Sequence, residues 1–537
     1  MSTRRRKFWG WGYEDESLPL DQQKMFGALL ASRFGVEMRE PQAEPRIEEV
    51  SLRAPRVKAP AAIEHLVSAA PPDRAGHTYG KAFRDVVRAY RRDFTPAPDL
   101  VAFPADEDDV VSLLDWCSSA RIAAIPYGGG STVVGGVEGR DLDDYAGVLS
   151  IDLMRLGRVL EIDRTSRAAR MQAGIYGPAL EDSLRSEGLT LRHFPQSFEF
   201  STLGGWIATR SGGHYATLYT HIDEFVESLR MVTPAGVMET RRLPGSGAGP
   251  SPDRMLIGSE GSLGIITEAW MRLQDRPKYR ASVSAKFDDY HHAAQAVRAI
   301  GQAALYPTNL RLLDAEEALN SGAGDGVSHV LLLAFESADH PLDAWMTRAL
   351  ELVRDHGGVV PEGAGRTRTD EGATREGAAG AWRDAFLRAP YLRDALVGMG
   401  AITDTFETAI TWDRFESFHG SVTAAVREAL VRICGGGSVT CRFTHVYPDG
   451  PAPYFTVIAP SIPERQLEDW DAIKTVAADA VLRLGGTITH HHSVGRDHRP
   501  WYDRQLPPLY VRALAAAKRE LDPAGVMNPG VLVDPAR

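Results

Sequence analysis

The chain has 537 residues, of which 43% are hydrophobic and 24% are charged, and its formal net charge at pH 7 is −11. This length exceeds what one hydrophobic core usually supports, so we expect two large domains. The acidic balance excludes non-specific nucleic-acid binding, which needs a basic surface. Three cysteines without CxxC spacing indicate neither a disulfide framework nor a zinc site, and they favour a reducing compartment.

The N-terminus reads MSTRRRKFWGWGYEDE and lacks the apolar core of a secretory signal. No stretch approaches the roughly 18 apolar residues of a membrane span, so we expect a soluble, cytoplasmic protein. Arg4 to Lys7 lie beside Trp9 and Trp11, a combination compatible with peripheral contact with a lipid surface, although a packed or frayed terminal arm is the favoured interpretation.

Residues 1–92 are predicted to form a mixed, largely helical N-terminal region. Residues 93–276 are predicted as a second unit, in which an acidic helix start at 106–109 precedes a helix and a buried strand that runs into glycines. Three further strands and a helix over 179–187 follow. A hairpin with Pro234-Ala235-Gly236 at its turn is predicted near the end of this unit.

Residues 277–485 alternate strand-like and helix-like segments, a pattern that predicts a sheet with helices on one face. Predicted helices over 415–433 and 467–484 flank the strand pair SVTCRFTHVY and PYFTVIAP. Residues 486–537 are expected to carry a histidine loop and return to the preceding unit. The predicted fold class is therefore α+β.

Glycine clusters give the first indication of function. Pro126–Gly136 reads PYGGGSTVVGG, and consecutive glycines let backbone N–H groups form a concavity that suits pyrophosphate, whereas a plain turn is the alternative. The stretch is not a G-x-G-x-x-G fingerprint, because Val133 stands where a glycine is required. With the similar segments Ser201–Tyr215 and Gly258–Gly264, it predicts one large phosphate-bearing cofactor bound without a Rossmann fold.

Pro126–Thr132, Gln196–Gly212 and Ile257–Ala269 resemble the FAD-binding domain of the vanillyl-alcohol oxidase, or PCMH-type, flavoprotein superfamily, and so does the closing stretch DPAGVMNPGVL. Within it, nearly the whole chain resembles the alkyldihydroxyacetonephosphate synthase (alkylglycerone-phosphate synthase) family. The motifs that carry the narrower resemblance are FWGWGY (Phe8–Tyr13), LRLLD (Leu310–Asp314), APYLRDAL (Ala389–Leu396), TFETAITWDR (Thr405–Arg414), CRFTHVY (Cys441–Tyr447), Tyr454-Phe455 and HHHSVG (His490–Gly495).

This resemblance implies a PCMH-type FAD-binding domain of two subdomains, an α+β cap domain, and FAD bound non-covalently. The cofactor-binding residues that it implies are Pro126, Tyr127, Gly128, Gly129, Gly130, Ser131, Thr132, Gln196, Ser197, Phe198, Glu199, Phe200, Ser201, Thr202, Thr209, Arg210, Ser211, Gly212, Glu260, Gly261, Ser262, Leu263, Gly264, Ile265 and Ile266.

The resemblance also implies a transferase of ether-lipid synthesis. Such enzymes exchange the acyl group of acyl-dihydroxyacetone phosphate for a long-chain fatty alcohol, with no net redox change, and are usually homodimers. Tyr454 matches the family's catalytic tyrosine, Arg393 its substrate-contacting arginine, and Arg311 an arginine needed for activity. An ion pair of Arg393 with Asp394, or of Arg311 with Asp314, is the alternative for each arginine.

His490, His491 and His492 match the family's essential triple histidine. In an extended segment His490 and His492 share one face and His491 points the other way, so at most two could ligate one ion. We therefore predict no metal site and a proton-handling wall instead, with His491 facing the substrate.

Two other functions remain open. A redox enzyme on the same fold, a 2-hydroxy-acid dehydrogenase or oxidase, could use the same base and arginines. A flavin- or lipid-binding protein without catalysis could use the fold as a scaffold. The motif FWGWGY and the triple histidine favour the transferase.

Overall fold

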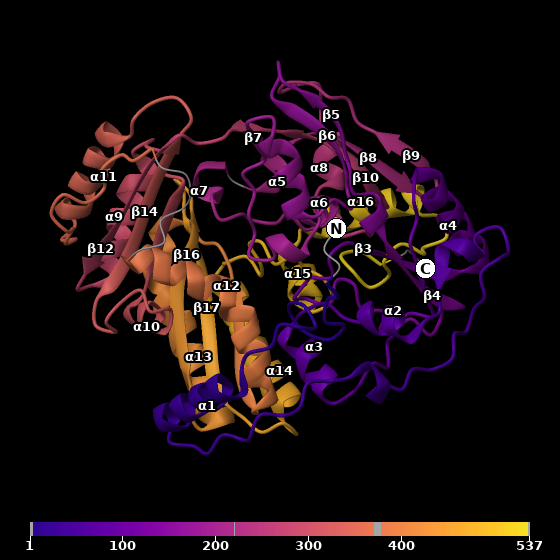
Figure 1. Cartoon of the computed structure of the whole chain (residues 1–537), viewed down its shortest axis with the longest axis horizontal. Helices are drawn as coiled ribbons and strands as arrows, with labels where there is room; N and C mark the ends of the chain where they lie inside the picture. Colours follow the sequence, from indigo (N-terminus) through magenta and orange to yellow (C-terminus); the bar gives the residue numbers. More distant parts are fainter. Residues whose placement is uncertain (1–3, 220, 370–376, 535–537) are drawn as a thin grey trace.

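A computed structural model describes residues 4–219, 221–369 and 377–534 of the chain. In Figure 1 the first half of the chain, coloured indigo to magenta, lies mainly on one side, and the salmon and orange segments form a second layer on the other. The N-terminal helices are α1 (Leu20–Phe34), α2 (Pro71–Gly76) and α3 (Phe83–Tyr90). Among the described residues, no helix combines the length and apolar character needed to cross a bilayer.

The first sheet has the strand order β1-β2-β4-β3, and β4 runs parallel to both β2 and β3. Helix α4 (Glu107–Ala120) begins where the Asp106 carboxylate accepts the N–H of Asp109 at 3.0 Å. The C-terminal segment joins this sheet, because the N–H of Asn528 donates to the carbonyl of Ala124 at 2.9 Å. The strands are β1 (Val67–Ser68), β2 (Leu100–Ala102), β3 (Ile122–Tyr127) and β4 (Gly147–Asp152).

The second sheet is antiparallel, with the order β5-β6-β10-β8-β9. The predicted hairpin is confirmed, since β8 pairs with β9 around Gly236. Helices α5 (Gly177–Arg185) and α6 (Leu203–Thr209) contribute Leu180 and Trp206 to the buried core on this sheet. The strands are β5 (Val159–Asp163), β6 (Ala168–Gln172), β8 (Val226–Thr233), β9 (Gly236–Glu239) and β10 (Ile265–Arg272); smaller elements are α7 (Ala216–Tyr219), α8 (Pro252–Leu256), β7 (Leu189–Thr190) and β11 (Gln274–Asp275).

The third sheet is also antiparallel, with the order β12-β14-β13-β16-β17-β15. Its strands are β12 (Tyr279–Phe287), β13 (Asn309–Leu313), β14 (His329–Ser337), β15 (Ala401–Glu407), β16 (Ser438–Val446) and β17 (Pro451–Pro460). The largest core of the molecule lies between one face of this sheet and the helices α9 (Tyr290–Gln302), α11 (Asp343–Asp355), α13 (Trp412–Cys434) and α14 (Gln466–Arg483). The predicted layer of helices on a sheet is thereby confirmed.

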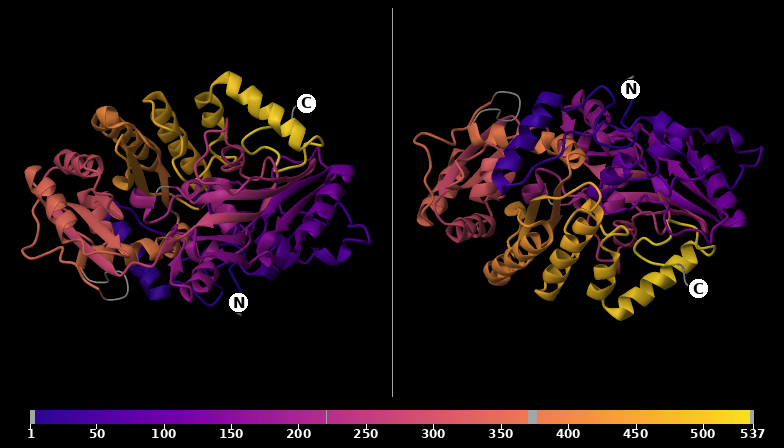
Figure 2. Two further views of the ribbon diagram at one scale, coloured as in Figure 1. Left: turned by 90° about the horizontal axis from the view of Figure 1, so that it is seen from above. Right: turned by 90° about the horizontal axis from the view of Figure 1, so that it is seen from below.

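The opposite face of the third sheet is only partly covered, by α10 (Ala315–Asn320) and α12 (Gly377–Gly398). The last helices, α15 (Arg499–Gln505) and α16 (Pro508–Leu521), run along the edge of the first half and are yellow in Figure 2.

Strand register places charged side chains together on that second face. Tyr454 of β17 pairs with Glu407 of β15 on one side and with Arg442 of β16 on the other. Directly paired residues of antiparallel strands project to the same face, and their sequence neighbours Phe406, Cys441 and Phe455 belong to the core beneath the helices. A polar row therefore crosses three neighbouring strands.

Candidate active site

A cavity lies where the glycine loop after β3 meets the polar face of the third sheet. The predicted substrate and catalytic residues Tyr454, Arg311, Arg393, His491 and His492 line it. The predicted cofactor residues in its wall are Pro126, Tyr127, Gly128, Gly129, Gly130, Ser131, Thr132, Gln196, Ser197, Ser201, Thr202, Thr209, Ser211, Gly212, Glu260, Gly261, Gly264, Ile265 and Ile266.

Six predicted cofactor residues lie outside this wall, namely Phe198, Glu199, Phe200, Arg210, Ser262 and Leu263. Phe198 stacks on Trp206, with ring centroids 6.1 Å apart, and Arg210 pairs with Asp223 at 3.1 Å. Phe198 and Arg210 support the loops that form the wall, and a contact of these six residues with the cofactor stays a prediction.

The glycine loop presents unpaired backbone donors. The N–H groups of Gly129, Gly130 and Ser131 donate to no residue that the structure describes. Gly130 has φ +65°, and a Cβ on Gly129 would lie 1.8 Å from the carbonyl oxygen of Phe200. A run of free amides in a cavity wall fits the phosphate oxygens of FAD.

Three more polar atoms of the wall are buried without a partner among the described residues. They are Ser259 Oγ, Thr444 Oγ1 and His445 Nδ1. Because buried polar groups are nearly always hydrogen-bonded, these atoms fit a ligand with several hydrogen-bonding groups, as the ring system of FAD has.

Tyr454 lies beneath a cation. Its hydroxyl donates to Thr405 Oγ1 at 2.9 Å, and the Arg442 guanidinium carbon lies 3.9 Å from the centre of its ring. Burial raises the pKa of the phenol, whereas the charge of Arg442 lowers it. Arg442 is in turn paired with the buried carboxylate of Glu317. Tyr454 is therefore a neutral phenol at neutral pH whose anion a fixed cation would stabilise.

The triple histidine is held by one buried carboxylate. Glu407 accepts the backbone N–H groups of His490, His491 and His492 at 2.5, 3.1 and 2.8 Å and the Thr489 hydroxyl at 2.6 Å. Burial works to raise the pKa of this carboxyl, but the neighbouring imidazoles and the hydrogen bonds outweigh it and hold the pKa at about 2.

His490 stands behind the cavity wall. Its Nε2 lies 2.8 Å from Tyr447 Oη and 3.1 Å from His221 Nε2, and its Nδ1 lies 3.0 Å from His491 Nδ1. The expectation that His490 and His492 share a face is wrong, because three successive N–H groups turn toward one carboxylate and the chain is not extended there. His491 and His492 line the cavity instead.

Burial works against protonation of the histidines. Burial, as the first cause, lowers the pKa of His445, His490 and His491 well below the usual value. Nitrogens of these three side chains lie within 4.8 Å of one another, so the group that could hold an ion is His445 of β16 with His490 and His491, and not the pair His490 and His492 considered from the sequence. That the site works without a metal remains a prediction.

Similarity to known proteins agrees with this geometry. Residues 98–241 match the family described as FAD binding domain, and residues 276–532 match FAD linked oxidases, C-terminal domain. Over 473 residues the chain is 30% identical to an alkyldihydroxyacetonephosphate synthase of Dictyostelium discoideum, covering 86% of this chain and 77% of that protein. The chain belongs to the alkyldihydroxyacetonephosphate synthase family.

A solved alkyldihydroxyacetonephosphate synthase superposes on this family member with a TM-score of 0.79 at 26% identity, covering 97% of this chain and 98% of the other. Glycolate oxidase subunit GlcD of Bacillus subtilis (strain 168) is more distant, at 26% identity over 457 residues, with 82% of this chain covered and 91% of that protein. The family matches identify FAD as the cofactor of this protein.

In this synthase-family chain the N-terminal arm forms part of the wall. Trp11 lines the cavity, and its backbone N–H donates to Asp394 Oδ2 of α12 at 2.6 Å. Asp394 also accepts two hydrogen bonds from Arg393, at 2.8 and 3.1 Å. Trp9 and Trp11 are buried, so the packed arm is observed and these two rings are not available to a membrane. Arg393 therefore both pairs with Asp394 and lines the cavity, so the two alternatives considered for it do not exclude each other.

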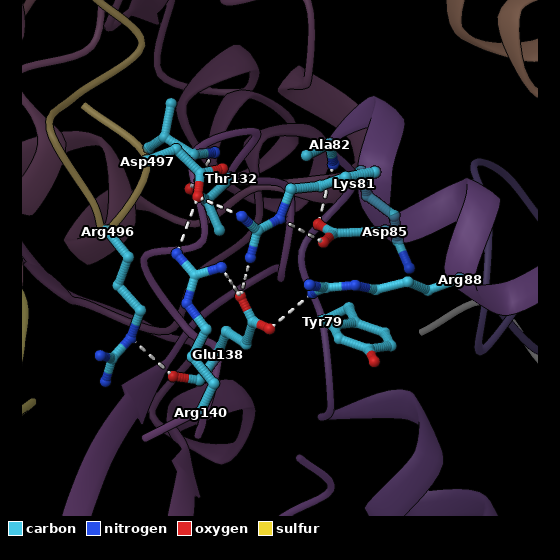
Figure 3. A network of polar contacts seen from close by, with 12 residues as sticks. Tyr79, Lys81, Ala82, Asp85, Arg88, Thr132, Glu138, Arg140, Arg496 and Asp497 are labelled. Carbon is cyan, nitrogen blue, oxygen red and sulfur yellow. Dashed lines mark hydrogen bonds and ion pairs between the residues drawn. The ribbon is translucent and has the colours of Figure 1, made fainter. Parts of the chain in front are cut away.

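A buried ion cluster fastens the histidine loop to the first half (Figure 3). Arg84 of α3 donates to Glu138 at 2.5 Å and to Asp497 at 2.6 Å. Arg140 also donates to Asp497, and Arg496 donates to the carbonyl of Glu138, both at 3.0 Å. Segments from α3, from the stretch after the glycine loop and from the end of the histidine loop therefore meet in one network.

Sequence reasoning missed four residues of the site. Arg442, His445, Glu407 and Trp11 were seen only as letters of family motifs, without a role. A signal for Arg442 existed: Thr440, Arg442 and Thr444 alternate with apolar residues along a buried strand, which is the pattern of a strand with one polar face.

Proposed function

We propose that this protein exchanges the acyl group of acyl-dihydroxyacetone phosphate for a long-chain fatty alcohol, as an FAD-dependent alkylglycerone-phosphate synthase. The observation that carries the proposal is the joint presence, in one cavity, of Tyr454 under Arg442, the wall of His491 and His492, and Arg393. FAD supplies the nucleophile of the exchange when it is bound.

The protein's own groups would then bind and move protons. Arg393 offers a guanidinium to the phosphate of the substrate, as planar donor forks do for phosphate oxygens. Tyr454 Oη holds the proton that the reacting carbon loses and regains, and Arg442 stabilises the phenolate between those steps. His491 and His492, which are kept in place by Glu407, receive the hydroxyl proton of the incoming alcohol.

The exchange assay tests this proposal. FAD-loaded wild-type protein is incubated with palmitoyl-dihydroxyacetone phosphate and radiolabelled hexadecanol, and labelled alkyl ether is measured. Tyr454→Phe is expected to lower the rate by about 100-fold or more while FAD stays bound, the range of a lost general acid–base group. A wild-type protein that forms no ether refutes the proposal.

The redox alternative is tested in the same preparation. A 2-hydroxy-acid dehydrogenase or oxidase would bleach the flavin when lactate or glycolate is added anaerobically. The relative that favours this reading is the more distant glycolate oxidase subunit. Bleaching by a simple hydroxy acid would favour it over the synthase.

Assembly and location remain proposals that rest on the family resemblance. We infer a cytoplasmic homodimer with peripheral membrane contact. Because Trp9 and Trp11 are packed inside, such contact would have to use other apolar side chains, and Leu20, Met25 and Leu29 of α1 are exposed. Analytical ultracentrifugation and co-sedimentation with phospholipid vesicles test the two parts separately.

A further inference from the structure

Arg311 is a buried cation without a counter-charge. It lies in β13 with 1% of its surface exposed, and its Nε and Nη1 have no hydrogen-bond partner. No nitrogen of its guanidinium pairs with any residue in the described part of the chain. An isolated buried charge costs several kcal/mol, so an anion from outside the protein is the expected partner.

The neighbouring carboxylate does not serve this role. Asp314 caps α10 by accepting the N–H of Glu317 at 2.7 Å, and it also accepts the N–H of Cys441. The local salt bridge considered from the sequence is therefore not formed. Burial, and then the charge of Arg442, lowers the pKa of Arg311 to about 9, and an anion beside it would offset both effects by favouring the charged guanidinium.

The surroundings of Arg311 are apolar and aromatic. Its guanidinium carbon lies 3.9 Å from the ring centre of Trp382 and 5.8 Å from that of Phe386, both on α12. His214 stacks on Trp382, at 5.8 Å between ring centroids. A single cation set in aromatic rings suits the head of an amphiphile better than a phosphate dianion, which needs more donors.

The other arginines of the cavity are already engaged. Arg442 is paired with Glu317, and Arg393 with Asp394 while its Nη1 donates to the carbonyl of Lys81 at 2.7 Å. Arg393 lines the cavity with Trp11 of the N-terminal arm, and its Nη1 and Nη2 each keep a second N–H that can bind a phosphate oxygen. Among the described residues of the cavity wall, Arg311 is thus the arginine without any hydrogen-bond or ion-pair partner, and it lies at the aromatic side.

We propose that Arg311 binds the carboxylate of the long-chain fatty acid that leaves during the exchange, an inference that rests on the proposed function. In that reaction the bond between the dihydroxyacetone carbon and the ester oxygen breaks, and its electron pair stays on the carboxylate. The alcohol oxygen forms the new bond to that carbon and releases its proton. Arg311 stabilises the charge that develops on the departing oxygens and later holds the product acid.

Binding measurements on the FAD holoenzyme test this inference without turnover. Palmitate, hexadecanol and dihydroxyacetone phosphate are titrated separately, and the shift of the flavin spectrum and equilibrium dialysis report binding. Arg311→Met keeps the length of the side chain and removes its charge. It is expected to weaken palmitate binding by about 30-fold, the size of a charged hydrogen bond, and to change hexadecanol binding by less than about twofold. Arg311→Lys, which keeps the charge, should fall between.

Arg393→Met is the matched control. It should weaken the binding of dihydroxyacetone phosphate and leave the binding of palmitate nearly unchanged. The inference is overturned if Arg311→Met binds palmitate as tightly as the wild type. It is also overturned if the affinity for hexadecanol falls as much as that for palmitate, or if the affinity for dihydroxyacetone phosphate falls instead. If the wild type is active in the exchange assay but palmitate binds equally well to Arg311→Met, this inference is refuted and the proposed function is not. If the wild type shows no exchange activity but Arg311→Met selectively loses palmitate binding, the proposed function is refuted and Arg311 is still shown to bind a fatty carboxylate.

Discussion

Individual residues of this site act through positions that only their contacts explain. Glu407 is an example, since it touches no cavity surface and yet determines where three histidines lie by accepting their N–H groups. Arg442 likewise lies over the ring of Tyr454, where its charge would stabilise a phenolate. Glutamate and arginine are common residue types, so the contacts that Glu407 and Arg442 make distinguish them from other residues of the same type.

Replacing Glu407 with glutamine should destabilise the protein and unlock the histidine loop. The pKa of Glu407 falls from 4.5 to about 2 on folding, which corresponds to about 3 kcal/mol of stability. Because the folded-state pKa is depressed, this contribution is complete above pH 4.5 and is lost as the pH falls toward 2. Calorimetry of wild type and Glu407→Gln should show a gap in Tm at pH 7 that narrows below pH 4.5.

Glu468→Gln, at an exposed position of α14, is the control and should show no gap. A difference in Tm between wild type and Glu407→Gln that is the same at every pH would contradict the stabilising role of the ionised carboxylate.

At the scale of elements, two short segments without regular structure shape the cavity: the glycine loop after β3 and the N-terminal arm. The loop depends on the close approach of backbone to backbone, as the 1.8 Å distance from a Cβ of Gly129 to the Phe200 carbonyl oxygen shows. The arm depends on one carboxylate, Asp394, that accepts from both Trp11 and Arg393.

Gly129→Ala should remove FAD from the purified protein. The added Cβ would force the loop away from the backbone at Phe200, and the amides that fit phosphate would lose their arrangement. The ratio of flavin absorbance to polypeptide is expected to fall by about tenfold, the effect of losing one or two strong hydrogen bonds. Gly245→Ala, where an added Cβ meets nothing within 4 Å, should keep full flavin. Full flavin in Gly129→Ala would count against the loop as the phosphate site.

Asp394→Asn should loosen the arm and weaken substrate binding together. The variant loses the charge that orients Arg393 and accepts the N–H of Trp11. We expect the KM for palmitoyl-dihydroxyacetone phosphate to rise by about tenfold and tryptic cleavage near Arg4–Lys7 to become faster. Asp413→Asn, at an exposed position of α13, is the control. A raised KM with unchanged cleavage would separate the arm from Arg393.

At the scale of the whole molecule, the chain closes on itself. The C-terminal segment lies beside β3, and the ion cluster of Figure 3 connects α3, Glu138 and Asp497, which are up to 413 residues apart in sequence. The cavity therefore has one wall from each half of the chain, and its geometry depends on how the halves dock.

Glu138→Gln tests that docking. Glu138 is 1% exposed and lies within hydrogen-bonding distance of Arg84 and Arg88. Removing its charge breaks the buried ion pair with Arg84, which keeps Asp497 as its other partner, and breaking a buried pair costs about 3–5 kcal/mol. Calorimetry should show a marked loss of Tm and earlier release of FAD on heating. Glu239→Gln, which breaks an exposed pair with Arg230, should change stability by less than about 1 kcal/mol. Equal effects of the two variants would show that the cluster does not hold the halves together.

Patterns local in the sequence were sufficient for part of this result. The hairpin of β8 and β9, the helices on the third sheet and the class of cofactor follow from turn residues, periodicity and glycine runs, because backbone geometry is encoded over a few neighbouring residues. The family resemblance added the positions of Tyr454, Arg311 and Arg393. It could not separate residues that touch the cavity from those that support it, as Phe198 and Arg210 illustrate.

The sequence alone therefore determined the elements, the FAD loop and the identity of the acid–base candidates. Only the tertiary structure decided that His490 stands behind His491, that Glu407 gathers the loop, and that Arg311 lacks the partner that Asp314 could have supplied. The physical reason is register: side chains from strands far apart in the chain meet through hydrogen-bonded pairing, which no local pattern encodes.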